Sequence, residues 1–310
     1  MQNIRTNTQQ HRGFTLLELL VVITIIAVLA GLLLPSLSRA KQSAQGIYCL
    51  NNGKQMMVAM TLYAGDNHDF FPPNPDDGNT DPGYNWCSGQ AGIGQPQEFD
   101  PDVLKDPTRS PLINYLSGNV SLFRCPSDMR QGMYQGTDPT LVGRTVPAAR
   151  TYSMSQAVGT IDPGFDAGEP GNGRHYGIPD LSVNGRWLND QGIHRRDSPW
   201  ATYGKFSSIG VTGPAILWVL VDENANGLND AAFAFGMEDP TWIDAPGSYH
   251  NGGCGFAFAD GHSEIHGWHG DPEPHSEAIE KDWGWMRTHT SAHVGSGPTP
   301  SSGINSAQGK

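Results

Sequence analysis

A histidine-rich stretch around residue 260 carries side chains that could bind a transition metal. His262, Glu264 and His266 alternate along the chain, so on a β-strand all three would project from one face. Imidazole and carboxylate ligands suit zinc and related ions, and His250 or Asp260 could complete the set. Two other interpretations are open. The alternating polar residues could face solvent on an edge strand, or His250 and Asp260 could form a hydrogen bond that fixes the strand to the preceding loop.

An acidic turn forms a second candidate metal site. Oxygen-bearing side chains recur there at alternate positions: Asp222, Asn224, Asn226 and Asp230. With Gly227 at the bend, this spacing resembles the first part of a calcium loop. Phe233 stands where a full EF-hand loop has a bidentate glutamate, and turns rich in Asp and Asn are common without any ion. Asp222 and Glu223 could instead pair with His250 across a sheet. The candidate cofactors are calcium and zinc, and neither is certain.

The cysteines are too few and too scattered to define a pairing. The chain has four: Cys49, Cys87, Cys125 and Cys254. They are candidates for disulfides if the segment lies outside the cytoplasm. Four cysteines allow three pairings, and the sequence does not choose among them. Free buried thiols are the alternative. None of the four has the close spacing of a metal-binding motif.

Enzymatic and nucleic-acid functions are not favoured by the sequence. It contains no G-x-S-x-G, P-loop or dinucleotide-binding fingerprint, so we expect no catalytic site. A metal-dependent surface hydrolase built on residues 250–266 is a less favoured alternative. The formal net charge is −12, with 31 acidic and 19 basic residues. Because phosphate contacts require clustered Lys and Arg, no nucleic-acid partner is expected.

The N-terminal region contains the element that organises the chain. Residues 14–34 form a run of 21 apolar or small residues in which Glu18 is the only charge. As a helix this run would span roughly 32 Å, which is the thickness of a bilayer core. Arg5 and Arg12 precede it, so the positive-inside rule places the leader in the cytoplasm and residues 36–310 outside. A carboxylate is costly in hydrocarbon, so Glu18 should seek a cation.

This N-terminal pattern resembles the signal of type IV pilins and type II secretion pseudopilins. The matching residues are Gly13, Phe14, Thr15, Leu16, Glu18 and Pro35. The resemblance implies that a prepilin peptidase cleaves after Gly13, that Phe14 is N-methylated, and that Glu18 docks subunits by pairing with a neighbour's amino terminus. Its implied partners are the inner membrane, other pilin-like subunits, the peptidase and an assembly platform. Two alternatives are a plain membrane anchor and a secretory signal cleaved after Ala30.

Beyond the membrane span, the pattern predicts an α+β head on a long helix. Apolar residues at three- and four-residue steps, Ile47 among them, continue an amphipathic helix through Pro35 to about Ala64, and Gly53 and Lys54 interrupt this apolar stripe. Residues 215–221 form a continuous apolar run, which predicts a central strand buried on both faces. Residues 150–158 predict a weaker strand. The resulting fold is a hydrophobic helix packed on a mainly antiparallel sheet with long loops.

A β-hairpin is predicted near the C-terminus, where Asp260-Gly261 separates two alternating segments. A two-residue loop would place Phe258 opposite Ser263 and Phe256 opposite Ile265. With His250 nine residues before Asp260-Gly261, the segment resembles the C-terminal region of pilin-like proteins known for an H-x9-DG spacing. That resemblance implies no activity.

The sequence thus divides into five parts. We expect a leader at residues 1–13, a transmembrane segment at 14–34, an amphipathic continuation at 35–64, an extracytoplasmic head at 65–290 and a disordered tail at 291–310. The H-x9-DG region covers about residues 215–270 of the head. The predicted function is a pilin-like subunit of a type II secretion or type IV pilus-like filament. The main alternative is a membrane-anchored surface binding protein that does not polymerise.

Overall fold

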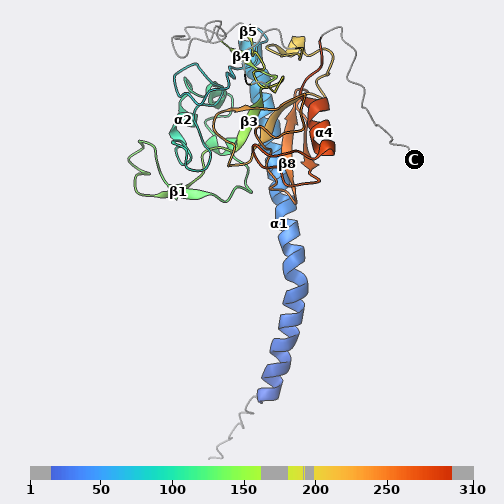
Figure 1. Cartoon of the computed structure of the whole chain (residues 1–310). Coiled ribbons are helices and arrows are strands. Elements are labelled where there is room, and N and C mark those ends of the chain that lie inside the picture. The colour runs from blue at the N-terminus through green and yellow to red at the C-terminus, as the bar shows by residue number, and fades with distance from the viewer. Residues whose placement is uncertain (1–14, 162–180, 191, 193–198, 295–310) are drawn as a thin grey trace, which may run out of the picture. The chain divides into compact units, whose positions relative to one another are not determined.

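The computed structural model describes residues 15–161, 181–190, 192 and 199–294 (Figure 1). The predicted processing residues Gly13 and Phe14 and the chain from residue 295 onward lie outside the described residues. The chain divides into two compact units, residues 1–42 and 43–310. The first contains the start of helix α1, and the second contains the rest of that helix and the head.

Helix α1 spans Leu16–Asp66 without a break and contains Pro35 in its interior. The prediction of one helix reaching about Ala64 is therefore confirmed. In its apolar half, a stretch of 18 residues has a mean hydropathy of 2.9, and none of these residues is buried inside the protein. By length and composition the helix can cross a membrane, and exposed leucine, isoleucine and valine side chains cover it from Leu16 to Leu37.

A five-stranded sheet forms the centre of the head, in the order β7-β3-β6-β8-β9. Its strands are β3 (Tyr152–Ser155), β6 (Trp218–Asp222), β7 (Ala232–Phe233), β8 (Gly253–Phe258) and β9 (Ser263–Gly267). Only the β3–β7 pair of this sheet is parallel. The α+β class and the central, fully buried position of β6 are confirmed. This strand begins three residues later than predicted, because Gly213, at φ 79°, starts a turn closed by a hydrogen bond from Leu217 N.

Short elements and loops make up the rest of the head. They are α2 (Asp102–Lys105), η1 (Pro111–Asn114), η2 (Val120–Phe123), β1 (Gln131–Met133), β2 (Thr145–Pro147), β4 (Thr160–Ile161), β5 (Leu181–Ser182), η3 (Phe206–Ser208) and α4 (Glu280–Thr290). Helix α4 was not expected from the sequence. The apolar residues of α4 do not recur with a clear helical period. Contacts with side chains of the sheet hold this helix in place.

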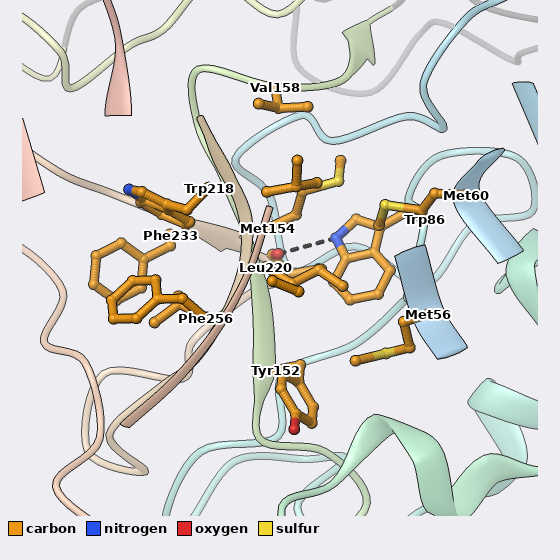
Figure 2. Packing of buried hydrophobic residues seen from close by; sticks show 14 of the residues in the cluster. Met56, Met60, Trp86, Tyr152, Met154, Val158, Trp218, Leu220, Phe233 and Phe256 are labelled. Carbon is orange, nitrogen blue, oxygen red and sulfur yellow. Dashed lines mark hydrogen bonds between the residues drawn. The ribbon is translucent and has the colours of Figure 1, made fainter. Parts of the chain in front are cut away.

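Two hydrophobic layers lie on opposite faces of the sheet (Figure 2). On one face, Met56 and Met60 of α1 pack with Trp86 and with Leu220 of β6. The other face carries aromatic rings from three strands: Trp218, Phe233 and Phe256. There the Trp218 Nε1–H donates to Thr290 Oγ1 at the end of α4, over 2.9 Å. The sheet is thus covered by α1 on one side and α4 on the other.

The hairpin of β8 and β9 exists as predicted, but the predicted register is wrong by one residue. Phe256 lies opposite Glu264 and Ala257 lies opposite Ser263. The loop has three residues, because Phe258 N donates to His262 O and Gly261 adopts φ 91°. A left-handed glycine at the third position is the usual end of such a loop. The shift places Glu264, and not Ile265, on the face of Phe256, so the two faces of β9 are exchanged relative to β8.

Helix α1 approaches the hairpin of β8 and β9 closely at two glycines, Gly46 and Gly53. A Cβ added to Gly53 would lie 3.1 Å from Ser263 Oγ and 3.2 Å from Ala257 Cβ. At Gly46 it would lie 2.7 Å from Ile265 Cδ1. The predicted apolar stripe placed Ile47 on the packed face and treated Gly53 as an interruption. In the structure Ile47 is 68% exposed and Gly53 is buried, because the close approach of helix and sheet selects for glycine.

We expect Gly53→Leu to lower the free energy of unfolding of the head by about 1–3 kcal/mol, the usual cost of overpacking. The larger side chain must push α1 away from Ala257 and Ser263. Gly65→Ala is the matched control within the same helix, because a Cβ there meets nothing within 4 Å. Thermal unfolding of the two variants checks the prediction, and equal melting temperatures would refute the close packing of Gly53.

Candidate functional site

The start of helix α1 is a capping box formed by Thr15 and Glu18. Thr15 Oγ1 accepts a hydrogen bond from Glu18 N at 3.2 Å, and Glu18 Oε2 accepts from Thr15 N at 2.9 Å. The Thr15 hydroxyl also donates to Glu18 Oε2 at 2.8 Å. This reciprocal arrangement satisfies amide groups that have no partner within the helix. Glu18, predicted as an assembly residue, thus also has a local role at the helix start.

Three of the four candidate calcium ligands, Asp222, Asn224 and Asp230, have side-chain partners of their own within the protein. Asp222 is fully buried at the end of β6 and lies near Cys49 of α1. Asn224 Oδ1 accepts from Asn226 N at 3.0 Å within the turn, while its amide donates to Pro272 O. Asp230 Oδ1 accepts from Ala232 N. The turn therefore uses its Asp and Asn side chains to bond its own backbone, and calcium binding there stays a prediction.

His262, directly before β9, and His266 of β9 each stack on an aromatic ring. His262 stacks on Phe258 with ring centroids 4.2 Å apart, and its Nδ1 lies 2.6 Å from Asp260 Oδ1. His266 stacks on Trp285 of α4 at 3.8 Å. Glu264, between them, is exposed. His250 does not join this group and does not bond Asp260, so the proposed contact between these two residues of the H-x9-DG spacing is not formed.

Four ligand-type side chains converge instead at the other face of the sheet. They are Cys49, Cys125, Asp222 and His250, whose ligand atoms all lie within 4.8 Å of one another. They form the single group of three or more His, Cys, Asp and Glu ligands that the described residues bring together. The exposed fractions are 1% for Cys49, 0% for Cys125 and Asp222, and 5% for His250. We call this group the buried cluster.

Four separate segments contribute to the buried cluster. Cys49 lies on α1, Cys125 follows η2, Asp222 ends β6, and His250 precedes β8. Cys125 Sγ lies 3.3 Å from His250 Nε2, and Asp222 Oδ2 lies 3.8 Å from both Cys49 Sγ and His250 Nε2. The alternative in which Asp222 approaches His250 is confirmed. The inclusion of two cysteines was missed, because no local spacing links residues 49 and 125 to the other two.

Burial governs the protonation of the cluster. It raises the pKa of the Asp222 carboxyl well above its ordinary value, and the neighbouring Cys125 raises it further. Burial also raises the pKa of the Cys125 thiol, to which the hydrogen bond and the charge of Cys49 add. It lowers the pKa of His250. Each group is therefore driven towards its neutral form, which is the form that a charge-free interior tolerates.

Helix α1 and the loop after η2 hold the cysteines in register. Gln45 Nε2 donates to Pro126 O at 3.0 Å, and Asn52 Nδ2 donates to Arg124 O at 3.1 Å. These residues flank Cys49 on one helix face, since they lie four before it and three after it. Cys125 N donates to Thr151 Oγ1 at 2.8 Å. The segment Arg124 to Pro126 is therefore fixed against the helix at both ends.

All four cysteines are buried thiols in this structure. None of the candidate disulfides is formed. Cys49 and Cys125 belong to the buried cluster, whereas Cys87 does not. Burial raises the pKa of the Cys87 thiol to about 12, against the opposing effect of the Arg150 charge. Cys87 is therefore an inert core residue at neutral pH.

Comparison with known proteins identifies the N-terminal segment. A family model described as the prokaryotic N-terminal methylation motif matches residues 8–34. Type II secretion system core protein G of Escherichia coli (strain K12) is 41% identical over 67 residues, which are 22% of this chain and 46% of that protein. The protein of the same name from Klebsiella pneumoniae is 41% identical over 59 residues, 19% of this chain and 42% of that protein. No solved structure matches the chain.

These matches confirm the prepilin-type motif that Gly13, Phe14 and Glu18 predicted. The chain spans less than half the length of the curated relatives that it matches. Their similarity covers about a fifth of this chain. The resemblance to the H-x9-DG proteins stays a prediction.

Proposed function

We propose that this protein is a pilin-like subunit of a type II secretion or type IV pilus-like filament. The observation that carries the proposal is the methylation motif at residues 8–34, which includes the apolar start of helix α1. Such a helix exposes large apolar side chains, for example Leu16 at 88%. Exposed apolar surface of this extent requires a membrane or other helices around it. The membrane would surround these side chains before assembly, and a filament core of packed helices would surround them afterwards.

In this proposal the chain is inserted with residues 1–13 in the cytoplasm and the head outside. A prepilin peptidase cleaves between Gly13 and Phe14, and the new amino group is methylated. Glu18 then pairs with the amino terminus of a neighbouring subunit, and an assembly platform adds subunits from the inner membrane. The head acts mechanically or by adhesion, without catalysis. The similarity to proteins named type II secretion core protein G favours a secretion filament over a pilus.

A membrane-anchored binding protein that never polymerises is the second candidate. Glu18 is what favours the filament, because an anchor needs no charge within its apolar run. The capping box does not remove this argument, since glutamine can cap a helix as well as glutamate does. The charge itself therefore has a purpose beyond the helix start.

We expect Gly13→Leu to prevent processing almost completely, so that the membrane-bound protein keeps its 13-residue leader. Immunoblotting or intact mass of the membrane fraction measures the shift. Ala30→Leu is the matched control, because it would block a secretory signal peptidase cleaving after Ala30 but leave the prepilin site intact. If Ala30→Leu blocks processing while Gly13→Leu does not, the segment is an ordinary secretory signal and the proposal fails.

A further inference from the structure

We infer that Cys49, Cys125, Asp222 and His250 form a structural zinc site that fixes helix α1 to the sheet of the head. This inference does not depend on the proposed function. It begins from the convergence of four ligand atoms within 4.8 Å, each from a different segment of the head. Two cysteines, one histidine and one aspartate supply the soft and borderline ligands that zinc prefers over calcium or magnesium.

Three of the six ligand-to-ligand distances within the cluster fall in the range of a tetrahedral zinc site, and the others are at most 4.8 Å. Zinc bonds of 2.0–2.3 Å give ligand-to-ligand separations of about 3.3–3.8 Å in a tetrahedron. Cys125 Sγ and His250 Nε2 are 3.3 Å apart. Asp222 Oδ2 lies 3.8 Å from Cys49 Sγ and 3.8 Å from His250 Nε2. Only small movements of side chains are needed for all four atoms to bind one ion.

An unsatisfied oxygen gives independent support for a cation. Asp222 Oδ1 is buried and makes no hydrogen bond. A buried carboxylate oxygen without a partner is costly, and each such atom in a folded protein calls for an explanation. Coordination of the carboxylate by a metal ion would remove the cost, because the ion offsets the charge that burial otherwise penalises.

Groups around the cluster hold its ligands in a binding arrangement. Ser127 Oγ lies 3.3 Å from His250 Nδ1. The hydroxyl can therefore accept a hydrogen bond from Nδ1–H, which leaves Nε2 free to bind metal. Ser127 N donates to Cys125 Sγ at 3.4 Å, as a backbone amide does to a thiolate ligand. Tyr152 Oη lies 2.8 Å from Cys49 Sγ, and its single proton can be donated either to that sulfur or to Cys49 O. These contacts are the outer shell that a metal-binding histidine and thiolate require.

The site has the character of a structural zinc centre and not a catalytic one. All four tetrahedral positions are taken by protein side chains, and none of them is more than 5% exposed. A catalytic zinc ion keeps an open position for water or substrate. Two thiolates, one carboxylate and one neutral imidazole around Zn²⁺ leave one net negative charge, the same as in a Cys3His site. The ion would join α1, the loop after η2, β6 and the loop before β8.

Metal analysis of the full-length protein, purified from membranes in detergent under reducing conditions, tests the inference. We expect about one zinc per chain in the wild type and less than about 0.1 in His250→Ala and in Cys49→Ser. Ser127→Ala should weaken zinc affinity roughly 10- to 100-fold, the usual effect of losing an outer-shell partner. Cys87→Ser is the matched control, because Cys87 is equally buried but lies outside the cluster, and it should keep its zinc.

A variant that fails to fold would also lose zinc, so two further measurements test the site without relying on such variants. Wild-type protein loaded with Co²⁺ should show the visible absorption of tetrahedral cobalt with thiolate ligands. His250→Cys should restore about one zinc per chain, since a third thiolate can replace imidazole. The inference is overturned if the wild type holds no zinc and takes up no cobalt, if zinc content is unchanged by the cluster substitutions, or if peptide mapping of protein isolated without reductant finds a Cys49–Cys125 disulfide.

Discussion

Glu18→Gln is expected to abolish incorporation of this protein into filaments while leaving it in the membrane. A carboxylate in an apolar helix needs a cation, and a neighbouring subunit's amino terminus at Phe14 would supply one. Removing the charge removes that pair but makes the helix more apolar, so insertion persists. We expect at least a tenfold drop of the protein in sheared filament fractions, equivalent to about 1.4 kcal/mol or more of lost docking free energy. Quantitative immunoblotting of filament and membrane fractions measures both effects.

The capping box provides the control for this experiment. Glutamine retains the acceptor that Thr15 N uses, so Glu18→Gln removes the charge and keeps the cap. Thr15→Ala does the reverse, because it removes the hydroxyl that accepts from Glu18 N and leaves the charge. Losing a cap costs about 1 kcal/mol of helix stability, which the flanking apolar helix can absorb. Assembly of Glu18→Gln at the wild-type level, or equal failure of both variants, would contradict a charge-based role.

Arg150→Met is expected to destabilise the head by about 3–5 kcal/mol, which is typical when one partner of a buried charged network is removed. Arg150 is 1% exposed. Its Nη1 donates to Tyr152 O and Ser153 Oγ, and its Nη2 donates to Gly89 O and Asp230 O, over 2.7–3.2 Å. Methionine fills similar space but leaves these buried oxygens without a donor. The loop at Gly89, strand β3 and the turn at Asp230 would lose their common link.

Thermal unfolding of the full chain in detergent measures the effect, and we expect the melting temperature to fall by roughly 10 °C or more. Arg150→Lys keeps the charge but loses the planar fork of the guanidinium group. Its melting temperature should therefore lie between those of the wild type and Arg150→Met. Arg144→Met is the matched control, because Arg144 is exposed and its loss should change stability by less than about 0.5 kcal/mol. A small effect of Arg150→Met would show that the network is replaceable by water.

The elements with strong periodic or continuous apolar patterns were predictable from sequence. Helix α1 was expected to end near Ala64 and ends at Asp66, and β6 was expected as a central buried strand. In both elements the pattern of apolar residues is long enough to outweigh the secondary-structure preferences of single residues. The register of the hairpin was not predictable in the same way. Ala259 joins the loop although nothing in its type marks it as a loop residue, and that one residue exchanges the faces of β9 relative to β8.

The buried cluster shows the main limit of reasoning from sequence. Asp222 and His250 were assigned to two different candidate metal sites, and their pairing with each other was only an alternative. Cys49 and Cys125 carried no metal-like spacing. Only the packing of α1 against the sheet brings these four residues together, through the glycine contacts at Gly53 and through Gln45 and Asn52. Tertiary proximity of this kind leaves no short-range signal in one sequence.

The central claim is that the chain is processed as a prepilin and assembled into a filament. The most direct measurement is mass spectrometry of the N-terminal peptide of the protein recovered from sheared surface filaments. We predict a peptide that begins at Phe14 and carries one N-methyl group. Absence of the protein from that fraction, or an N-terminus at Met1 or at Gly31, would contradict the claim.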